Sequence, residues 1–105
     1  MATILPFPVK KIVPIWGLTE HECDAVLAVA NDLILQGHAT SASIHNDGQY
    51  MCVFDGNGEP YSIGRERGVC YLTDSDETMF ARSQRFEIVL QALEILLSPP
   101  PDETV

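Results

Sequence analysis

Basic residues are scarce in this chain of 105 residues. Lysine and arginine together number 6 against 15 aspartates and glutamates, so the formal net charge is -9. Between Ile12 and Gly64 there is no lysine or arginine. Binding nucleic acid through its phosphates needs a basic surface, so the sequence predicts no direct nucleic-acid partner. An acidic inhibitor that mimics nucleic acid is an alternative from the charge alone, although most of the acids occupy turns, a helix start or the tail.

Cysteines and long apolar runs are also few. Cys23, Cys52 and Cys70 leave one thiol unpaired under any disulfide scheme and lack zinc-site spacing. We expect reduced thiols that pack in the core, and the sequence does not indicate a further role. No run approaches the roughly 18 apolar residues of a membrane span, and the first lysines follow the N-terminal apolar run rather than precede it. The expectation is a soluble, cytoplasmic protein without a membrane partner.

Catalytic signatures are missing as well. His21, His38 and His45 share no metal-ligand spacing, and the glycines form neither a GxGxxG motif nor a P-loop. Cys23 follows His21 by two residues on a predicted helix, where the two side chains diverge. The sequence therefore predicts no enzyme activity and no cofactor.

Length and composition predict one domain, since 46% of the residues are hydrophobic. Within 1–105, residues 1–17 read as a proline-punctuated arm and 18–97 as the folded core. Residues 98–105, rich in proline and acid, are expected to be disordered.

Two segments have the features of helices. Thr19 and Glu22 form a capping box and Gly37 is a stop signal, which predicts a helix from about Thr19 to Gln36. The second, "SQRFEIVLQALEILLS", is predicted to be capped by Ser83 and to end before Pro99. On this second helix the apolar surface continues around one flank, which needs a cover. That flank includes Ile88, Ala92 and Ile95.

Between the helices the hydrophobic pattern alternates and turn residues recur. This predicts strands at roughly 39–45, 49–54, 60–65 and 68–73, with a weaker fifth strand at 78–82. The fold class is therefore α+β, with two layers: an antiparallel meander of four to five strands flanked by an N-terminal and a C-terminal helix.

Loop lengths set the expected register. Two-residue loops at Asn57-Gly58 and Glu66-Arg67, with a three-residue loop at 46–48, align the apolar residues on one face. A two-residue Asp47-Gly48 loop would instead place Ser41, Ser43 and His45 against Tyr50, Cys52 and Phe54. The first choice predicts this core face: Ala42, Ile44, Tyr50, Cys52, Phe54, Tyr61, Ile63, Cys70 and Leu72.

In that register the second face of the sheet carries an apolar patch of Met51, Val53, Val69, Tyr71 and Phe80. Such a patch usually marks a contact surface. Either the N-terminal segment "KKIVPIWGL" folds over it or a second copy of the chain does. In both cases we expect Trp16 to be an anchor.

The stretch "DGNGEP" beginning at Asp55 places oxygen-bearing side chains at alternate positions, as in a calcium-binding loop. The EF-hand frame fails because its glycine position holds Pro60. A weaker possibility is an acidic rim, because alternate turns of a meander share one end of the sheet and the arginines at 65, 67, 82 and 85 should lie at the other. The rim candidates are Asp55, Asn57, Glu59, Asp74, Asp76 and Glu77.

The sequence thus predicts a small acidic protein-protein interaction module, or adaptor, that forms a homodimer. The alternative is a site for a cation or small ligand at the acidic rim. The residues expected at the interface are Trp16, Met51, Val53, Val69, Tyr71, Ile88 and Ile95.

Overall fold

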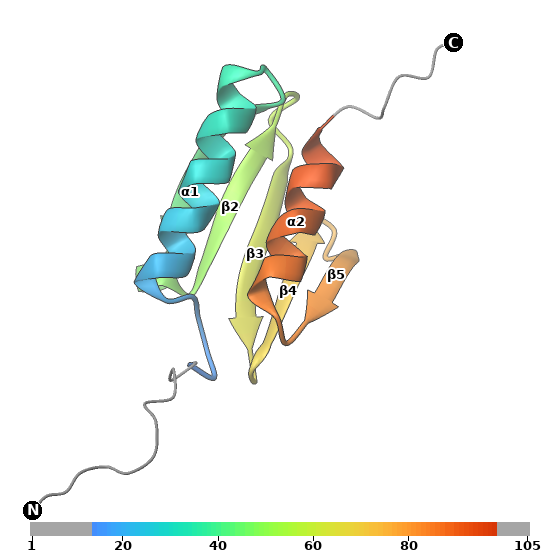
Figure 1. The fold of residues 1–105 in the computed structure, drawn as a ribbon. Coiled ribbons are helices and arrows are strands. Elements are labelled where there is room, and N and C mark those ends of the chain that lie inside the picture. The colour runs from blue at the N-terminus through green and yellow to red at the C-terminus, as the bar shows by residue number, and fades with distance from the viewer. Residues whose placement is uncertain (1–13, 99–105) are drawn as a thin grey trace, which may run out of the picture.

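The computed structural model describes residues 14–98. The predicted arm before residue 14 and the tail after residue 98 lie outside these residues. These residues form two helices and five strands, which confirms the α+β class and the order of elements. Figure 1 shows how they are arranged. In chain order the elements are α1 (Glu20–Leu35), β1 (Ala39–His45), a 3-10 turn (Asn46–Gly48), β2 (Tyr50–Asp55), β3 (Pro60–Glu66), β4 (Val69–Asp74), β5 (Met79–Ser83) and α2 (Phe86–Leu97).

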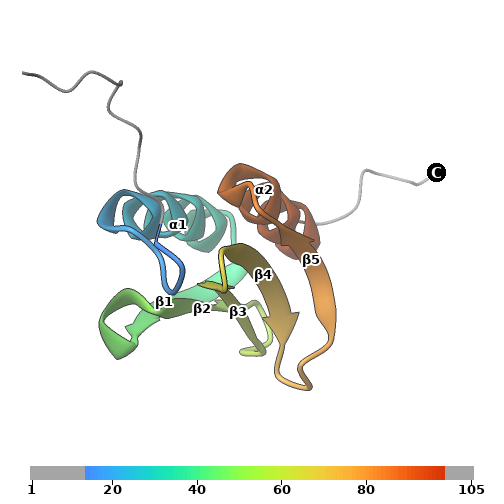
Figure 2. The same cartoon turned by 90° about the horizontal axis from the view of Figure 1, so that it is seen from below.

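The sheet is an antiparallel meander in which the strand order β1-β2-β3-β4-β5 follows the chain. Both helices lie on the same side of it, as Figures 1 and 2 show from two directions. Among residues 14–98 no helix covers the opposite side, which we call the open face. Within the described residues, one layer of helices therefore packs on one layer of sheet, and the second surface of the sheet carries no helix.

Helix α1 begins and ends where the sequence predicts. The Thr19 Oγ1 atom accepts a hydrogen bond from the backbone N–H of Glu22 (3.0 Å), and Glu22 Oε1 accepts one from the N–H of Thr19 (2.9 Å). The reciprocal pair satisfies two N–H groups that would otherwise lack partners. After the helix, Gly37 takes a φ of +84°, which favours glycine.

Helix α2 begins later than predicted. Ser83 is the last residue of β5, where it pairs with Cys70, so it is not the N-cap. Its hydroxyl instead accepts the backbone N–H of Arg85 (3.0 Å) in a turn that precedes the helix. Strand pairing holds Ser83 in an extended conformation, and Arg85 occupies the N-cap position without a side-chain hydrogen bond.

The predicted pairing of β2 with β3 was wrong by one residue. The loop contains three residues rather than two, because the Asp55 carboxylate accepts the N–H groups of Asn57 (2.8 Å) and Glu59 (2.9 Å). A one-residue shift turns every side chain of a strand to the other face. Met51 and Val53, predicted at the interface, are therefore 0% exposed beneath the helices and offer no contact surface.

The first hairpin does not adopt the register predicted from a three-residue loop at 46–48. It adopts the alternative pairing, which the sequence analysis did not choose. Ser43 pairs with Cys52 and His45 with Tyr50, across a turn in which Asn46 and Asp47 both have left-handed φ. Of the predicted core face, three residues point to the open face instead: Tyr50, Cys52 and Phe54.

The third hairpin loop, Arg67-Gly68, lies one residue later than predicted, which shifts the pairing by two residues and preserves the faces. Ile63, Cys70 and Leu72 are confirmed in the core at 0% exposure. The remaining core residues come from both helices, the inner face of the sheet and the segment before α1: Leu18, Cys23, Val26, Ala30, Leu33, Ala39, Phe86, Val89, Leu93 and Leu97.

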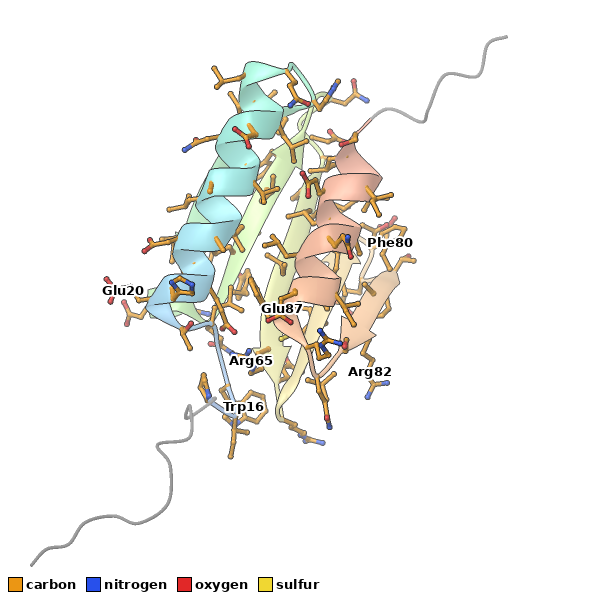
Figure 3. All side chains as sticks on the ribbon, in the orientation of Figure 1. Trp16, Glu20, Arg65, Phe80, Arg82 and Glu87 are labelled. Carbon is orange, nitrogen blue, oxygen red and sulfur yellow. The ribbon has the colours of Figure 1, made fainter. Side chains whose placement is uncertain are left out.

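Phe80 also departs from its predicted face. Leu72 pairs with Ala81 and Thr73 with Met79, so Phe80 has no partner on β4 and forms a β-bulge in β5. Its ring centroid lies 6.1 Å from that of Tyr61, on the helix side of the sheet. Figure 3 shows Phe80 beside α2.

Candidate functional site

The open face consists of every second side chain of the five strands. It combines small polar residues on β1 and β3 with aromatic residues on β2 and β4, and with apolar and charged residues toward β5. Its members are Ser41, Ser43, His45, Tyr50, Cys52, Phe54, Ser62, Gly64, Glu66, Val69, Tyr71, Thr73, Met79 and Arg82. An antiparallel sheet tolerates water on such a face, but the aromatic rings and the methionine add apolar area that water does not favour.

Tyr71 lies across the backbone of Gly64 at the centre of this face. A Cβ atom on Gly64 would be 2.6 Å from Tyr71 Oη, 2.9 Å from Tyr71 Cζ and 2.8 Å from Tyr50 Cβ. The missing side chain is therefore what lets the Tyr71 ring rest on the neighbouring strand. Burial raises the pKa of Tyr71, and the nearby Glu66 carboxylate adds to the shift. The ring therefore packs directly on the backbone of β3.

Two hollows adjoin the Tyr71 ring. One has a volume of about 510 Å³, and its lining includes Tyr50, Ser62, Thr73 and Glu77. The other has a volume of about 370 Å³ and is lined by Trp16, Arg67, Val69 and Arg82. Both also share Glu66, Tyr71 and Met79. The hollowed surface thus runs from the turn after β4 to the turn before β4. Met79, which is 52% exposed, lies where the two hollows meet.

The acidic end of this surface comes from two hairpin turns of the same design. Asp74 Oδ1 accepts the N–H groups of Asp76 (2.8 Å) and Thr78 (2.9 Å), as Asp55 Oδ1 does in the 55–59 turn. The left-handed position falls on Gly58 in one turn and Glu77 in the other. In "DGNGEP", the first carboxylate therefore stabilises a three-residue hairpin loop.

Tyr61 lies near both acidic turns. Burial raises the pKa of Tyr61, and the Asp55 and Asp74 carboxylates raise it further. The two turns therefore do share one end of the sheet, as the meander predicts. Across residues 14–98, no group of three or more His, Cys, Asp or Glu side chains is placed to hold a metal ion. Cation binding by the six rim residues stays a prediction.

The opposite end of the face is basic and adjoins the start of the described chain. The N–H of Gly68 donates to the carbonyl of Ile15 (2.9 Å), and the N–H of Gly17 donates to the carbonyl of Arg65 (3.0 Å). Figure 3 places Trp16, Arg65 and Arg82 near this end. Trp16 is 52% exposed and lines the second hollow.

Arg65 has a role that the sequence argument missed. It was expected among the arginines of the basic end, yet it is 1% exposed. Its Nη1 donates to Glu22 Oε1 (2.9 Å) and to the carbonyl of Gly17 (2.8 Å), and its Nη2 donates to Glu22 Oε2 (2.7 Å). Arg65 thus ties β3 to the first turn of α1. The alternation Tyr61, Ile63, Arg65 pointed to the inner face, but a lone arginine gives no sign of its partner.

The same ion pair makes stability sensitive to acid. Burial raises the pKa of the Glu22 carboxyl, but hydrogen bonds from Arg65 and Thr19 outweigh this, and the net shift is down from 4.5. The stabilisation is therefore complete above the unfolded pKa and is lost as the pH falls through the folded pKa. We expect the free energy of unfolding, measured in urea between neutral pH and about pH 3, to fall less steeply in Glu22→Gln than in the wild type. Equal slopes would show that other carboxyls cause the loss.

The remaining predicted contact residues lie away from the open face. Ile88 and Ile95 are 44% and 71% exposed on α2, which packs on the other side of the sheet. Only Val69 and Tyr71, with Trp16 at the edge, belong to the open face and its hollows. The predicted interface is therefore divided between two surfaces and the core.

One polar contact on the open face resembles part of a catalytic arrangement. Ser43 Oγ lies 2.8 Å from His45 Nε2, and the His45 ring stacks on Tyr50 with centroids 4.9 Å apart. A serine nucleophile also needs a group that orients the imidazole. Within residues 14–98 no hydrogen bond reaches the other nitrogen of the His45 ring.

The three cysteines are free and buried. Burial raises the pKa of Cys23 and of Cys70, which keeps these thiols protonated and less reactive.

Neither helix among residues 14–98 has the length and apolar character that a membrane span requires. No protein-family model, curated protein or solved structure shows significant similarity to this chain.

Proposed function

We propose that this chain is a non-catalytic protein-interaction module that associates with itself through the open face of its sheet. The observation that carries the proposal is the hollowed surface around Tyr71 and Met79, which the helices leave uncovered. The three free, buried thiols suit a reducing compartment, and the cytoplasm is its proposed location.

The construction of the surface supports a contact role. Residues that dominate binding energy are enriched in tyrosine, tryptophan and arginine, and the hollows are lined by Tyr50, Tyr71, Trp16 and Arg82. Because the Tyr71 ring already packs on the backbone of Gly64, we expect little side-chain entropy to be lost when a partner covers it. Methionine adapts its shape to an apposed surface, which suits Met79 at the centre.

Replacing Met79 with glutamate tests this surface with little risk to the fold, because the side chain is already 52% exposed. A charge at the centre of an apolar contact must be desolvated, so we expect the variant to be monomeric at concentrations where the wild type associates. Sedimentation equilibrium over a range of concentrations measures the masses, and circular dichroism checks the fold.

The matched control is Leu35→Glu, at an 85% exposed position on α1 outside the open face. It should leave the mass unchanged. Ile95→Glu examines the flank of α2 in the same way. If Ile95→Glu dissociates the protein and Met79→Glu does not, the contact surface is the helix flank and the proposal for the open face is wrong.

A further inference from the structure

We propose that the occupant of the open face is a second copy of this chain. The two copies are related by a two-fold rotation that sets the β5 strand of one copy antiparallel to the β5 strand of the other. The inference rests on the proposed function and adds to it a partner, an orientation and specific charge contacts. The orientation places the acidic end of each copy against the arginines of the other.

Charge is distributed unevenly along the hollowed surface. At one end of the hollowed surface the 74–77 turn carries Asp74, Asp76 and Glu77 and no basic residue. At the other end, Arg67 and Arg82 line the second hollow with one carboxylate, Glu66. A surface that is negative at one end and positive at the other complements itself when it is rotated by half a turn. This is the condition for a two-fold interface, in which both copies use the same patch.

Met79 lies between an acidic and a basic residue of the same hairpin. Glu77 lies two residues before Met79 and Arg82 three residues after it. Met79 lies opposite Thr73 and Arg82 opposite Tyr71, so the two are two ladder positions apart, or roughly 7 Å at about 3.3 Å per residue. Glu77 lies on the other side of Met79, in the turn that precedes β5. A two-fold axis at Met79 therefore brings Arg82 of one copy toward Glu77 of the other twice, while the two Met79 side chains meet at the centre.

Charge also selects the orientation. Docking with the two β5 strands parallel would place the acidic turn of one copy against the acidic turn of the other. Like charges in contact are disfavoured. The net charge of -9 makes distant copies repel. At an ionic strength of about 0.15 M the screening length is about 8 Å, so this repulsion is weakened and the groups in direct contact decide the orientation.

A charge exchange between two variants tests the arrangement. Arg82→Glu alone and Glu77→Arg alone each replace both attractive contacts with repulsive ones, so we expect each dissociation constant to rise roughly tenfold. When the two variants are mixed, every contact becomes an opposite-charge pair again: one native and one reversed. The mixture should therefore form a heterodimer with near wild-type affinity. Isotope labelling of one variant lets native mass spectrometry count the heterodimer.

Arg85→Glu is the matched control, because its side chain is 73% exposed and pairs only loosely with Glu87 (3.8 Å). It should not change the dissociation constant, nor form heterodimer preferentially with Glu77→Arg. If the wild type associates and Met79→Glu dissociates it, but the mixture forms no excess of heterodimer, the open face is the contact and the antiparallel docking is wrong. If the wild type is monomeric at all concentrations, both the self-association and this arrangement are overturned.

Discussion

Replacing Glu22 with glutamine is expected to lower the free energy of unfolding by about 3 kcal/mol, because it leaves the buried Arg65 cation without its counter-ion. The two carboxylate oxygens of Glu22 accept three hydrogen bonds, two from Arg65 and one from the N–H of Thr19. Breaking a buried pair from one side typically costs about 3–5 kcal/mol. The Glu22 side chain is 16% exposed, which places the expected loss at the lower end of that range.

Urea denaturation measures this loss, and Glu20→Gln is its control in the same first turn of α1 (Figure 3). The control should change stability by only a few tenths of a kcal/mol, since surface substitutions usually stay within about 0.5 kcal/mol. The double variant Glu22→Leu with Arg65→Leu should recover most of the loss, because it removes both charges together. If Glu22→Gln unfolds at the wild-type urea concentration, the ion pair contributes nothing to stability.

Replacing Gly64 with alanine is expected to destabilise the protein by about 1–3 kcal/mol, the usual range for overpacking. The φ of Gly64 is not positive, so the effect is steric. The Tyr71 ring can rotate away from the new methyl group. Tyr50 Cβ cannot, because it is fixed to the backbone of the paired strand, and β2 must therefore shift relative to β3.

Gly56→Ala is the matched control, since it also lacks a positive φ and its nearest contact is the carbonyl oxygen of Gly37 at 3.4 Å. Thermal melts of both variants give the stabilities. Adding Tyr71→Leu to Gly64→Ala should cost less than the separate effects predict, because the two residues touch. Additive effects would show that the ring does not press on Gly64. Displacing the ring should also weaken self-association.

Helix positions and strand order were predictable because each depends on neighbouring residues. The capping box of Thr19 with Glu22 and the turn residues between strands act within a few positions of the chain. The faces of the strands were harder to predict, because a difference of one residue in a loop moves the side chains of a strand to the other face of the sheet. Two and three residues are both acceptable loop lengths after Asp55, and the choice depends on hydrogen bonds from the Asp55 side chain.

The candidate site was predicted in part for the same reason. Val69 and Tyr71 kept their predicted face because the error before β4 was an even number of residues, whereas Met51 and Val53 moved into the core. The approach of Tyr71 to Gly64 and the bond from Arg65 to Glu22 join residues on different elements. The Arg65–Glu22 pair spans 43 positions of the sequence, a separation at which composition and periodicity give no information.

The meander also determines how the chain is able to fold. Every strand pairs with the strand that follows it, so each hairpin closes a short loop at a small entropic cost. The two helices lie at opposite ends of the described chain and meet on one face, so their contact closes the longest loop. Topologies dominated by local contacts fold quickly. Contacts that join distant segments, such as Arg65 with Glu22, are then expected to form late, and interactions that form late slow unfolding more than they speed folding. The buried ion pair would therefore act chiefly on how long each molecule stays folded.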